Sequence, residues 1–204
     1  VCKYYSAEGQ AAPFERQALI KLRHIAGDAA LGKKVETHRD SFVYSGAPWD
    51  LTVALDLRRQ QVKQLVEPGQ INLKHSHGGI VTLEYAIQYL QVMHGHRHPS
   101  LRTPNTLRAL AALIDVGLIP RATGENLRKS YLFIRMLIDG LRMVRGNTKD
   151  LVIPPPDSDE FIFLARRVGY QTEDWQAGAR HLQTDIEEHM KQNRQFFEKM
   201  FGKV

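Results

Sequence analysis

The sequence predicts a mainly α protein, a helical bundle with at most a short extended segment near residues 71–75. Apolar residues recur at helical spacing along most of the chain, and strand-like alternation is confined to Ile71–His75. Glycines and prolines divide the chain into segments of helix length. With 204 residues and 43% hydrophobic composition, the chain is long enough to bury a core in which helix packs on helix.

Two helices are expected before residue 45. The first is predicted to begin near Pro13, which suits a first helical turn, and to end at Gly27. Asp28 is then predicted to cap the second. The expected buried faces are Phe14, Ala18, Leu19 and Leu22 in the first helix, and Leu31, Val35 and Phe42 in the second.

Two further helices flank the extended segment. Trp49 and Asp50 are expected to open a helix that stops at Pro68-Gly69, and Gly78-Gly79 separates the extended segment from a helix that ends at Gly95. The expected apolar stripes are Leu51, Leu55, Val62, Leu65 and Val66 in one helix, and Ile80, Leu83, Ile87 and Leu90 in the other.

The rest of the chain predicts four helices. Thr103-Pro104 is a start signal, Gly146-Asn147 closes a long helix, the three prolines 154–156 exclude helix, and Asp157 is expected to cap a short helix. A final helix has a stripe close to a heptad repeat, which suits docking on a bundle or on a partner. The stripes are Leu107, Leu110 and Ile114; Leu127, Ile134, Leu137, Ile138, Leu141 and Val144; Phe161, Leu164 and Val168; and Trp175, Ala179, Leu182, Ile186, Met190, Phe197 and Met200 or Phe201.

Composition limits the classes of function. The only cysteine is Cys2, so no internal disulfide can form, and we expect a reducing compartment, the cytoplasm. No apolar run approaches the ~18–20 residues of a membrane span, and the first ten residues lack the pattern of a signal peptide, so we expect no membrane association. The net charge of +6 suits acidic partners, but 28 basic residues are interspersed with 22 acidic ones. That pattern favours a solvated surface over a nucleic-acid groove.

Two stretches are specific in order and spacing. The first is YYSAEGQAAPFERQALIKLRHIAGDAALG, residues 4–32, followed by FVY at 42–44, and the second is NLKHSHGGIVTLEYAIQYLQVMHGHRHPSLRTPNTLRAL, residues 72–110. Both resemble glutamine synthetase adenylyltransferases, in the portion that follows the metal-binding motif of a nucleotidyltransferase domain, and LRKSYLFIRMLIDGLRMV fits the same family's helical domain. The resemblance implies that residues 1–70 are the end of a nucleotidyltransferase domain with connecting helices, and that 71–204 are a helical bundle domain.

The resemblance also implies a function in nitrogen regulation. Members of the family attach AMP from ATP to a tyrosine of glutamine synthetase, or remove it, with Mg²⁺ at the active site. We therefore expect ATP and Mg²⁺ as cofactors of the full-length protein, with glutamine synthetase and a PII-type signalling protein as partners. The alternative is a non-catalytic module that binds glutamine synthetase or PII.

The motif that would hold the metal is missing from these residues. In the family a Gly-Ser-Asp-x-Asp element supplies the carboxylates, because Mg²⁺ needs oxygen ligands against the triphosphate. The nearest match is Asp157-Ser158-Asp159, which lacks the Gly-Ser lead and precedes a predicted helix, so capping is the favoured interpretation. We expect no catalytic residue here, no bound cofactor, and no activity from this chain alone.

Seven residues are candidates for contact with a substrate or nucleotide. Arg16, Lys21 and Arg23 resemble basic positions of the family and could face phosphates, although a solvated helix face is equally open. Lys74, Gly78, Gly79 and Glu84 form the second group: paired glycines allow close approach of a ligand, and the helix start offers free N–H groups to an anion. The alternatives are a plain turn and a structural ion pair of Glu84 with Lys74.

Two features of these motifs weaken the case for particular ligands. The position occupied by Thr82 is commonly acidic in the family; if that acid takes part in catalysis or substrate contact there, its contribution is lost or altered in this chain. Histidines cluster at residues 75 and 77 and at 94, 96 and 98, but no cysteine accompanies them. We interpret them as polar loop residues and predict no metal site.

Overall fold

The computed structural model describes residues 3–6, 9–12, 14–49, 51–147 and 150–202. Two expectations fall outside these ranges. They are the helix start at Pro13 and the contribution of Asp50 to the next helix start.

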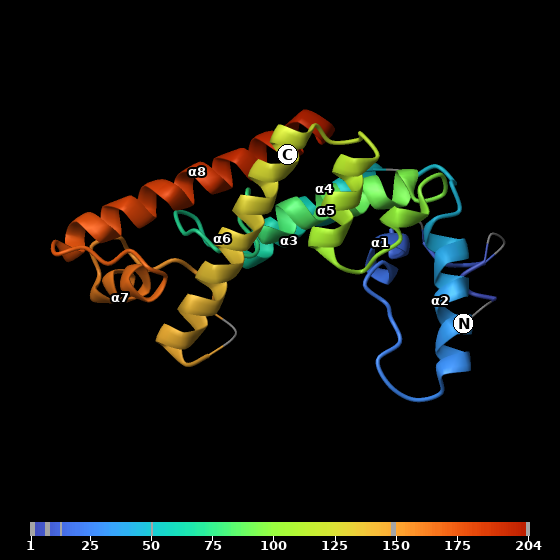
Figure 1. The fold of residues 1–204 in the computed structure, drawn as a ribbon, viewed down its shortest axis with the longest axis horizontal. Helices are drawn as coiled ribbons and strands as arrows, with labels where there is room; N and C mark the ends of the chain where they lie inside the picture. The colour runs from blue at the N-terminus through green and yellow to red at the C-terminus, as the bar shows by residue number, and fades with distance from the viewer. Residues whose placement is uncertain (1–2, 7–8, 13, 50, 148–149, 203–204) are drawn as a thin grey trace. The chain divides into compact units, whose positions relative to one another are not determined.

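The described residues form eight α-helices and one short 3-10 helix (Figure 1). In order they are α1 Glu15–Leu19, α2 Ala29–Val43, α3 Leu51–Leu65, α4 Ile80–His94, η1 Pro99–Leu101, α5 Thr106–Asp115, α6 Arg121–Arg145, α7 Asp159–Arg167 and α8 Trp175–Phe201. Within these ranges, β structure is limited to one isolated antiparallel bridge between Asn72 and Val152. The mainly α prediction is confirmed.

The chain folds as two compact units that interleave in sequence. Unit 1 contains Val1–Leu57 and Glu84–Gly124, and unit 2 contains Arg58–Leu83 and Glu125–Val204. The expected division near residue 70, between the end of a nucleotidyltransferase domain and a helical domain, stays a prediction. No helix in the part of the chain that the structure describes is both long and apolar enough to cross a membrane.

Unit 1 has a core around the end of α2. Asp28 caps α2 as predicted, because its side chain accepts a hydrogen bond from the Leu31 N–H. A cluster of buried side chains surrounds Val43, the last residue of the helix. Its buried members are Ile20, Val43, Tyr44, Trp49, Ala54 and Val92.

The predicted faces of the first two helices are wrong in part: Leu19 and Phe42 are partly buried and pack against the core of unit 1, but other predicted members are exposed. In α2, Leu31 and Val35 are exposed, because only the C-terminal end of the helix is buried, through Arg39 and Val43. Phe14 is exposed beside α1, which is a helix of five residues whose buried member is Arg16. The hydrogen bonds of Arg16 hold this segment to the end of α2 together with the buried Ile20.

Two predicted helix caps are displaced by one or two residues. Asn105, not Thr103, caps α5 by accepting from the Arg108 N–H, and Ser158, not Asp157, caps α7 by accepting from the Phe161 N–H. The side chains of Asn105 and Ser158 each reach the N–H group three residues on, so these residues satisfy the free donors of the two helix starts.

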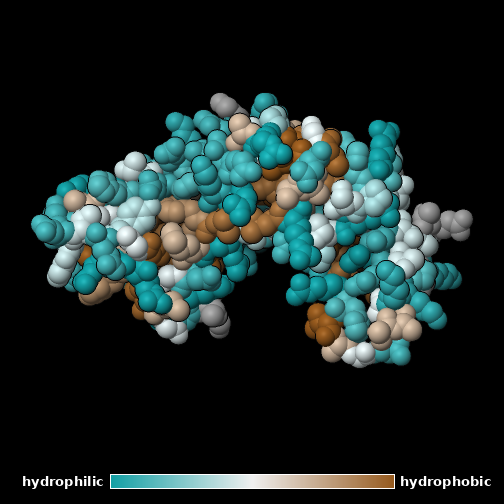
Figure 2. All heavy atoms as spheres, viewed as in Figure 1, coloured by the Kyte–Doolittle hydropathy of each residue, from teal (hydrophilic) through white to brown (hydrophobic). Residues whose placement is uncertain are grey.

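Unit 2 is built from α6, α7 and α8, with apolar stripes close to those predicted. On α6, Leu127, Ile134, Leu137, Ile138 and Leu141 are all buried. α7 lies against the N-terminal half of α8 (Figure 1), and Phe161 and Leu164 of α7 and Ala179 and Leu182 of α8 are all buried. Figure 2 shows mainly hydrophilic side chains along the outer edge of α8.

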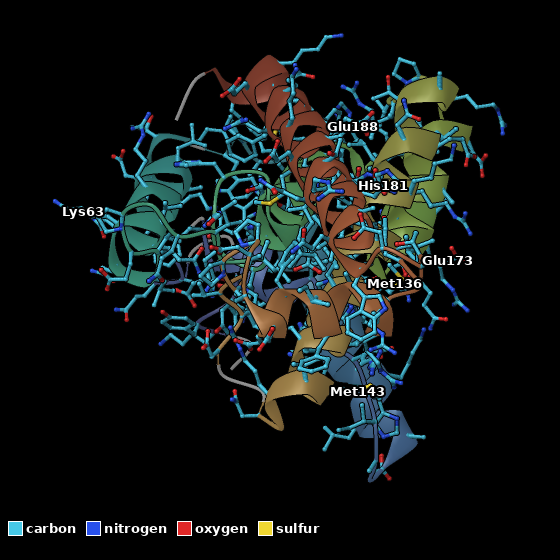
Figure 3. The ribbon with its side chains drawn as sticks, turned by 90° about the vertical axis from the view of Figure 1, so that its left-hand side faces the viewer. Lys63, Met136, Met143, Glu173, His181 and Glu188 are labelled. Carbon is cyan, nitrogen blue, oxygen red and sulfur yellow. The ribbon has the colours of Figure 1, made fainter. Side chains whose placement is uncertain are left out.

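The start of the apolar stripe on α8 differs from the prediction. Trp175, the first residue of α8, is 56% exposed, and the Arg166 guanidinium lies over its ring at 4.8 Å from the centroid. The opposite face of α6 is also partly apolar, since Leu132, Met136 and Met143 are exposed, and Lys63 on α3 projects into solvent (Figure 3).

A matched pair of substitutions on α6 tests the assignment of its two faces. Leu137→Ala is expected to lower the free energy of unfolding by about 2–5 kcal/mol, because Leu137 is fully buried and its loss leaves a cavity. Leu132→Ala, on the exposed face of the same helix, should cost less than about 1 kcal/mol. Urea denaturation followed by circular dichroism measures both, and equal losses would contradict the assignment.

Candidate functional site

The segment before α4 is a compact turn in unit 2 and not a strand. The Leu73 N–H donates to the Leu151 carbonyl at 2.9 Å, and the Ile153 N–H donates to the Ile71 carbonyl at 2.7 Å, on either side of the single bridge. The extended segment expected at 71–75 is therefore reduced to one bridge residue, because the chain turns immediately after Asn72.

Gly78 lies in close contact with the backbone of α8. Its φ is +87°, and a Cβ at this position would lie 2.1 Å from the Met190 carbonyl oxygen. The Gly78 carbonyl accepts a hydrogen bond of 3.0 Å from Nδ2 of Asn193, a fully buried residue. Only glycine combines this backbone conformation with this close approach.

The helix start after the glycine pair is already occupied by protein acceptors. The Gly79 N–H donates to the Ser76 carbonyl, the Ile80 N–H to the Leu73 carbonyl, and the Val81 N–H to the Lys74 carbonyl, at 2.9–3.2 Å. The expectation that this helix start offers free N–H groups to an anion is therefore wrong. The glycine pair folds the preceding loop back over the helix end.

Arg58 of α3 is hydrogen-bonded to this turn, and its side chain is among the largest that are fully buried. Its Nη2 donates to the His75 carbonyl at 2.8 Å, to the Ser76 carbonyl at 3.4 Å and to Thr82 Oγ1 at 3.1 Å. Its Nη1 donates to Gln61 Oε1 at 3.0 Å. One side chain thus joins α3, the turn and the first turn of α4.

Thr82 completes the arrangement as a buried acceptor and donor. Its Oγ1 accepts from the Gly78 N–H at 3.1 Å and donates to the Ser76 carbonyl at 3.3 Å. The sequence drew attention to Thr82 only as a departure from a family pattern, and it missed Arg58 and Asn193. The signal available for Arg58 was its position four residues after Ala54, on the buried side of α3.

The basic residues expected to face phosphates have separate environments in unit 1. Arg16 is buried: its Nε and Nη2 donate to the Val43 carbonyl, and its Nη1 donates to the Ala47 carbonyl at 2.9 Å, so it binds the end of α2. Burial lowers the pKa of Arg16 from its ordinary value. Arg23 is exposed and makes no hydrogen bond or ion pair with any described residue.

Glu84 has a different ionic partner from the one expected. Lys21 Nζ lies 3.7 Å from Glu84 Oε1, and both groups also contact the Thr106 hydroxyl, which Lys21 approaches to 2.8 Å. The suggested pairing with Lys74 is wrong, because Lys21 and Thr106 approach Glu84 within unit 1. Lys74 is exposed on the turn of unit 2.

The histidines of the turn do not form a metal centre with their described neighbours. No group of three or more His, Cys, Asp or Glu side chains among the described residues is placed to hold a metal ion. Burial, and secondarily the charges of Lys74 and Arg58, lower the pKa of His75 to about 4, so this imidazole is neutral at pH 7.

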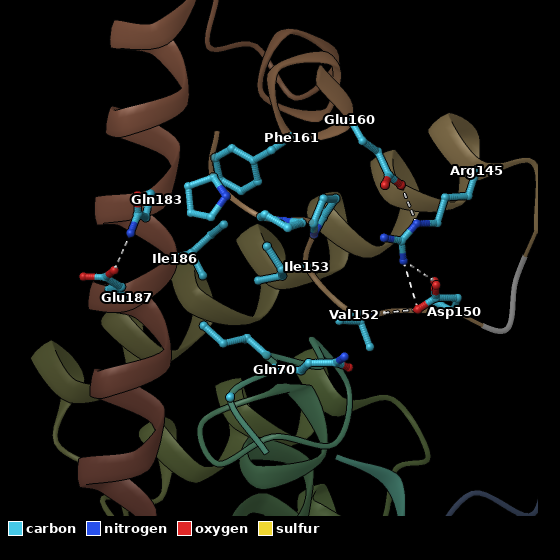
Figure 4. A pocket seen from close by; sticks show the side chains of 15 residues that line it. Gln70, Arg145, Asp150, Val152, Ile153, Glu160, Phe161, Gln183, Ile186 and Glu187 are labelled. Atoms are coloured by element: carbon cyan, nitrogen blue, oxygen red, sulfur yellow. Dashed lines mark hydrogen bonds and ion pairs between the residues drawn. The ribbon is translucent and has the colours of Figure 1, made fainter. Parts of the chain in front are cut away.

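Unit 2 has several hollows beside this turn. One, about 630 Å³, lies between 69–71, 152–156 and α8, and its cation Arg145 is ion-paired with Asp150 and Glu160 (Figure 4). A smaller one, about 190 Å³, lies under Arg58, and we call it the Arg58 pocket. It is lined by Arg58, His77, Thr82, Arg194, Phe197 and Glu198.

These side chains suit ligand binding more than acid–base catalysis. The Arg58 pocket presents two guanidinium groups, which stay protonated at any physiological pH. The large hollow presents ion-paired charges above apolar walls. Neither contains the paired aspartates that nucleotidyl transfer would require.

Comparison with known proteins decides the family. The family model described as GlnD PII-uridylyltransferase matches residues 53–201, which contain most of α3 and all later helices. The chain belongs to this family.

Curated proteins named for adenylyl transfer to glutamine synthetase are similar to this chain over most of its length. The bifunctional glutamine synthetase adenylyltransferase/adenylyl-removing enzyme of Mycobacterium tuberculosis is 36% identical over 157 residues, 75% of this chain and 16% of that enzyme. The enzyme of the same name in Corynebacterium glutamicum is 30% identical over 85% of this chain and 17% of its own length. The chain thus spans about a sixth of these relatives, and the resemblance drawn from the sequence is confirmed.

A substitution at the glycine turn tests its structural importance. Gly78→Ala is expected to destabilise the protein by roughly 3–5 kcal/mol, because the new Cβ would overlap the Met190 carbonyl at a positive φ. Gly69→Ala is the matched control in the same unit: φ is +79° but no atom lies within 4 Å, so only strain of about 1–2 kcal/mol is expected. Thermal denaturation compares them, and similar losses would contradict the contact with α8.

The neutral His75 predicts a pH dependence of stability. Its folded pKa of about 4 lies below the unfolded value near 6.5, so between these values the unfolded state binds more protons. Stability should therefore fall as the pH falls from about 6.5 towards 4. Urea titrations of wild type and His75→Gln at pH 7 and pH 5 measure the effect, and the variant should lose less stability on acidification. An identical loss in both would exclude His75 as a contributor.

Proposed function

We propose that the intact protein transfers AMP between ATP and a tyrosine of glutamine synthetase, or removes it, and that this chain is the helical part that follows a nucleotidyltransferase domain. The observation that carries the proposal is the sequence identity of 30–36% with bifunctional glutamine synthetase adenylyltransferase/adenylyl-removing enzymes. The aligned regions cover 75–85% of this chain. Membership of the GlnD PII-uridylyltransferase family, shown by the match over residues 53–201, also supports a helical domain of a nucleotidyltransferase.

The helical chain would bind and position its target without performing the chemistry. The residues printed for this chain contain no Gly-Ser-Asp-x-Asp element, and the described carboxylates do not gather into a metal-binding group. ATP and Mg²⁺ would therefore bind elsewhere in the intact protein. Glutamine synthetase is the proposed protein substrate, a PII-type protein a proposed regulator, and the cytoplasm the proposed compartment.

The main alternative is an interaction module that binds glutamine synthetase or PII and takes no part in adenylyl transfer. The exposed apolar side chains Leu132, Met136 and Met143 on α6 favour it, since exposed methionines are frequent at protein-binding surfaces. A nucleic-acid-binding domain has weaker support, because only the net charge of +6 suggests it.

An assay with the intact protein separates these functions. Incubated with glutamine synthetase and α-labelled ATP, the intact protein should label glutamine synthetase, or release AMP from the modified form when phosphate is supplied. Chelation of Mg²⁺ should abolish transfer, because the metal neutralises charge on the triphosphate in the transition state. The 204-residue chain alone should give no transfer.

The controls distinguish catalysis from binding. Absence of transfer in either direction, with and without PII and glutamine, would contradict the enzymatic proposal. Binding of glutamine synthetase by the 204-residue chain, together with an inactive intact protein, would establish the interaction module instead. Salt-sensitive RNA binding with no response to glutamine synthetase would exclude both.

A further inference from the structure

We infer that unit 2 contains a binding site for a phosphate group, formed by the Arg58 pocket, with an apolar substituent of the ligand in the adjacent hollow. The pocket has a volume of about 190 Å³ and is lined from α3, the turn before α4, α4 itself and α8. This volume accommodates a tetrahedral oxyanion together with the bonds that link it to a larger molecule. The inference concerns this chain alone and does not depend on adenylyl transfer.

The charges of the pocket favour an anion. Arg58 and Arg194 contribute two positive charges and Glu198 one negative charge, so the lining carries +1 with His77 neutral and +2 with His77 protonated. Guanidinium groups match the oxygens of phosphate in both geometry and charge. The side chain of Arg194 makes no hydrogen bond or ion pair with another described residue, so its donors can turn to a ligand.

Arg58 is held in place before any ligand arrives. Its guanidinium is fixed by four hydrogen bonds, to Gln61, to two carbonyls of the turn and to Thr82. The residue is only 1% exposed. A fixed cation loses little conformational entropy on binding. Because it is withdrawn from water, its attraction for an anion in the pocket is less screened than that of a surface arginine.

A further hollow of unit 2, adjacent to the Arg58 pocket and distinct from the one around Arg145, indicates what the phosphate would be attached to. It has a volume of about 500 Å³, and His77 and Arg194 line both it and the Arg58 pocket. Its other walls are mainly apolar, from Val62, Val66, Ile71, Ile186 and Met190. A phosphate in the Arg58 pocket would thus lie beside a space suited to an aromatic or aliphatic group, which indicates a phosphomonoester.

His77 gives the site a pH dependence. Burial, followed by the charges of Arg58 and Arg194, lowers the pKa of His77, while Glu198 acts in the opposite direction. An anion between these groups would favour the imidazolium form, so the pKa of His77 would rise on binding. By linkage, the anion should bind more tightly as the pH falls.

Titration calorimetry of the 204-residue chain tests the site with phenyl phosphate and inorganic phosphate. Phenyl phosphate is expected to bind with a dissociation constant of about 1 mM or lower, and about tenfold more tightly than inorganic phosphate, because its ring is removed from water. Arg194→Ala should weaken phenyl phosphate at least about tenfold, the loss expected when a charged hydrogen bond is removed.

Matched controls separate the pocket from general charge attraction. Lys199→Ala removes an exposed cation of α8 that does not line the pocket, and it should leave binding unchanged. Both replaced side chains are exposed, so both variants should fold, as circular dichroism can verify. Equal weakening by the two substitutions would mean charge attraction without a site, and would overturn the inference.

Sulfate supplies the pH test, because it stays doubly charged from pH 5 to pH 8 whereas phosphate titrates in this range. Sulfate should bind several-fold more tightly at pH 6 than at pH 8, and His77→Ala should remove that difference. Absence of saturable binding of all three anions, or an unchanged pH dependence in His77→Ala, would contradict the site as described.

Discussion

Arg58 carries a full positive charge at a position where the residue is 1% exposed, and unit 2 is organised around the need to satisfy it. Its hydrogen bonds reach two carbonyls of the turn and the Thr82 hydroxyl, so α3, the turn and α4 adopt one arrangement together. A buried guanidinium without acceptors would be costly, so formation of the turn and burial of α3 are coupled. The close contact of Gly78 with Met190 then fixes α8 against the same turn.

The same constraint explains why the glycine pair is not an anion-binding loop. Binding of an anion at a helix N-terminus requires N–H groups that have no acceptor within the protein. Here the carbonyls of residues 73, 74 and 76 take the N–H groups of residues 80, 81 and 79. Positive charge for a ligand comes instead from side chains, Arg58 and Arg194, on the two helices that flank the turn. The conformational freedom of glycine serves packing, and the cations provide recognition.

The family relationship is consistent with a chain that binds a ligand or target and does not perform the reaction. Relatives about six times as long as the matched region are named for adenylyl transfer and removal, and the described carboxylates of this chain form no metal-binding group. A helical unit with rigid turns and preformed hollows can orient a target or a ligand while the reaction takes place elsewhere. The Arg58 pocket would let such a unit respond to a phosphorylated small molecule through the turn that joins three of its helices.

The sequence by itself determined the fold class, the positions of the long helices and the family. Periodicity was sufficient for α6 and α8 because both bury one long stripe, from Leu127 to Leu141 and from Ala179 to Phe197. It was only partly right for α1 and α2, where Leu19 and Phe42 pack against the core but Phe14 and Leu31 are exposed, and where the buried Arg16 donates to the Val43 carbonyl. Local patterns carry no information about acceptors 27 residues away.

Tertiary structure alone decided the chemistry of the candidate site. The resemblance indicated the turn around Gly78, but the ionic partner of Glu84 proved to be Lys21, 63 positions away in the chain, and Arg58 had drawn no attention. Whether a basic residue binds phosphate, caps a helix or joins a buried network depends on which carbonyls and hydroxyls surround it in space. That arrangement arises only when separate segments pack together, so it cannot be read from the spacing of residues along one helix.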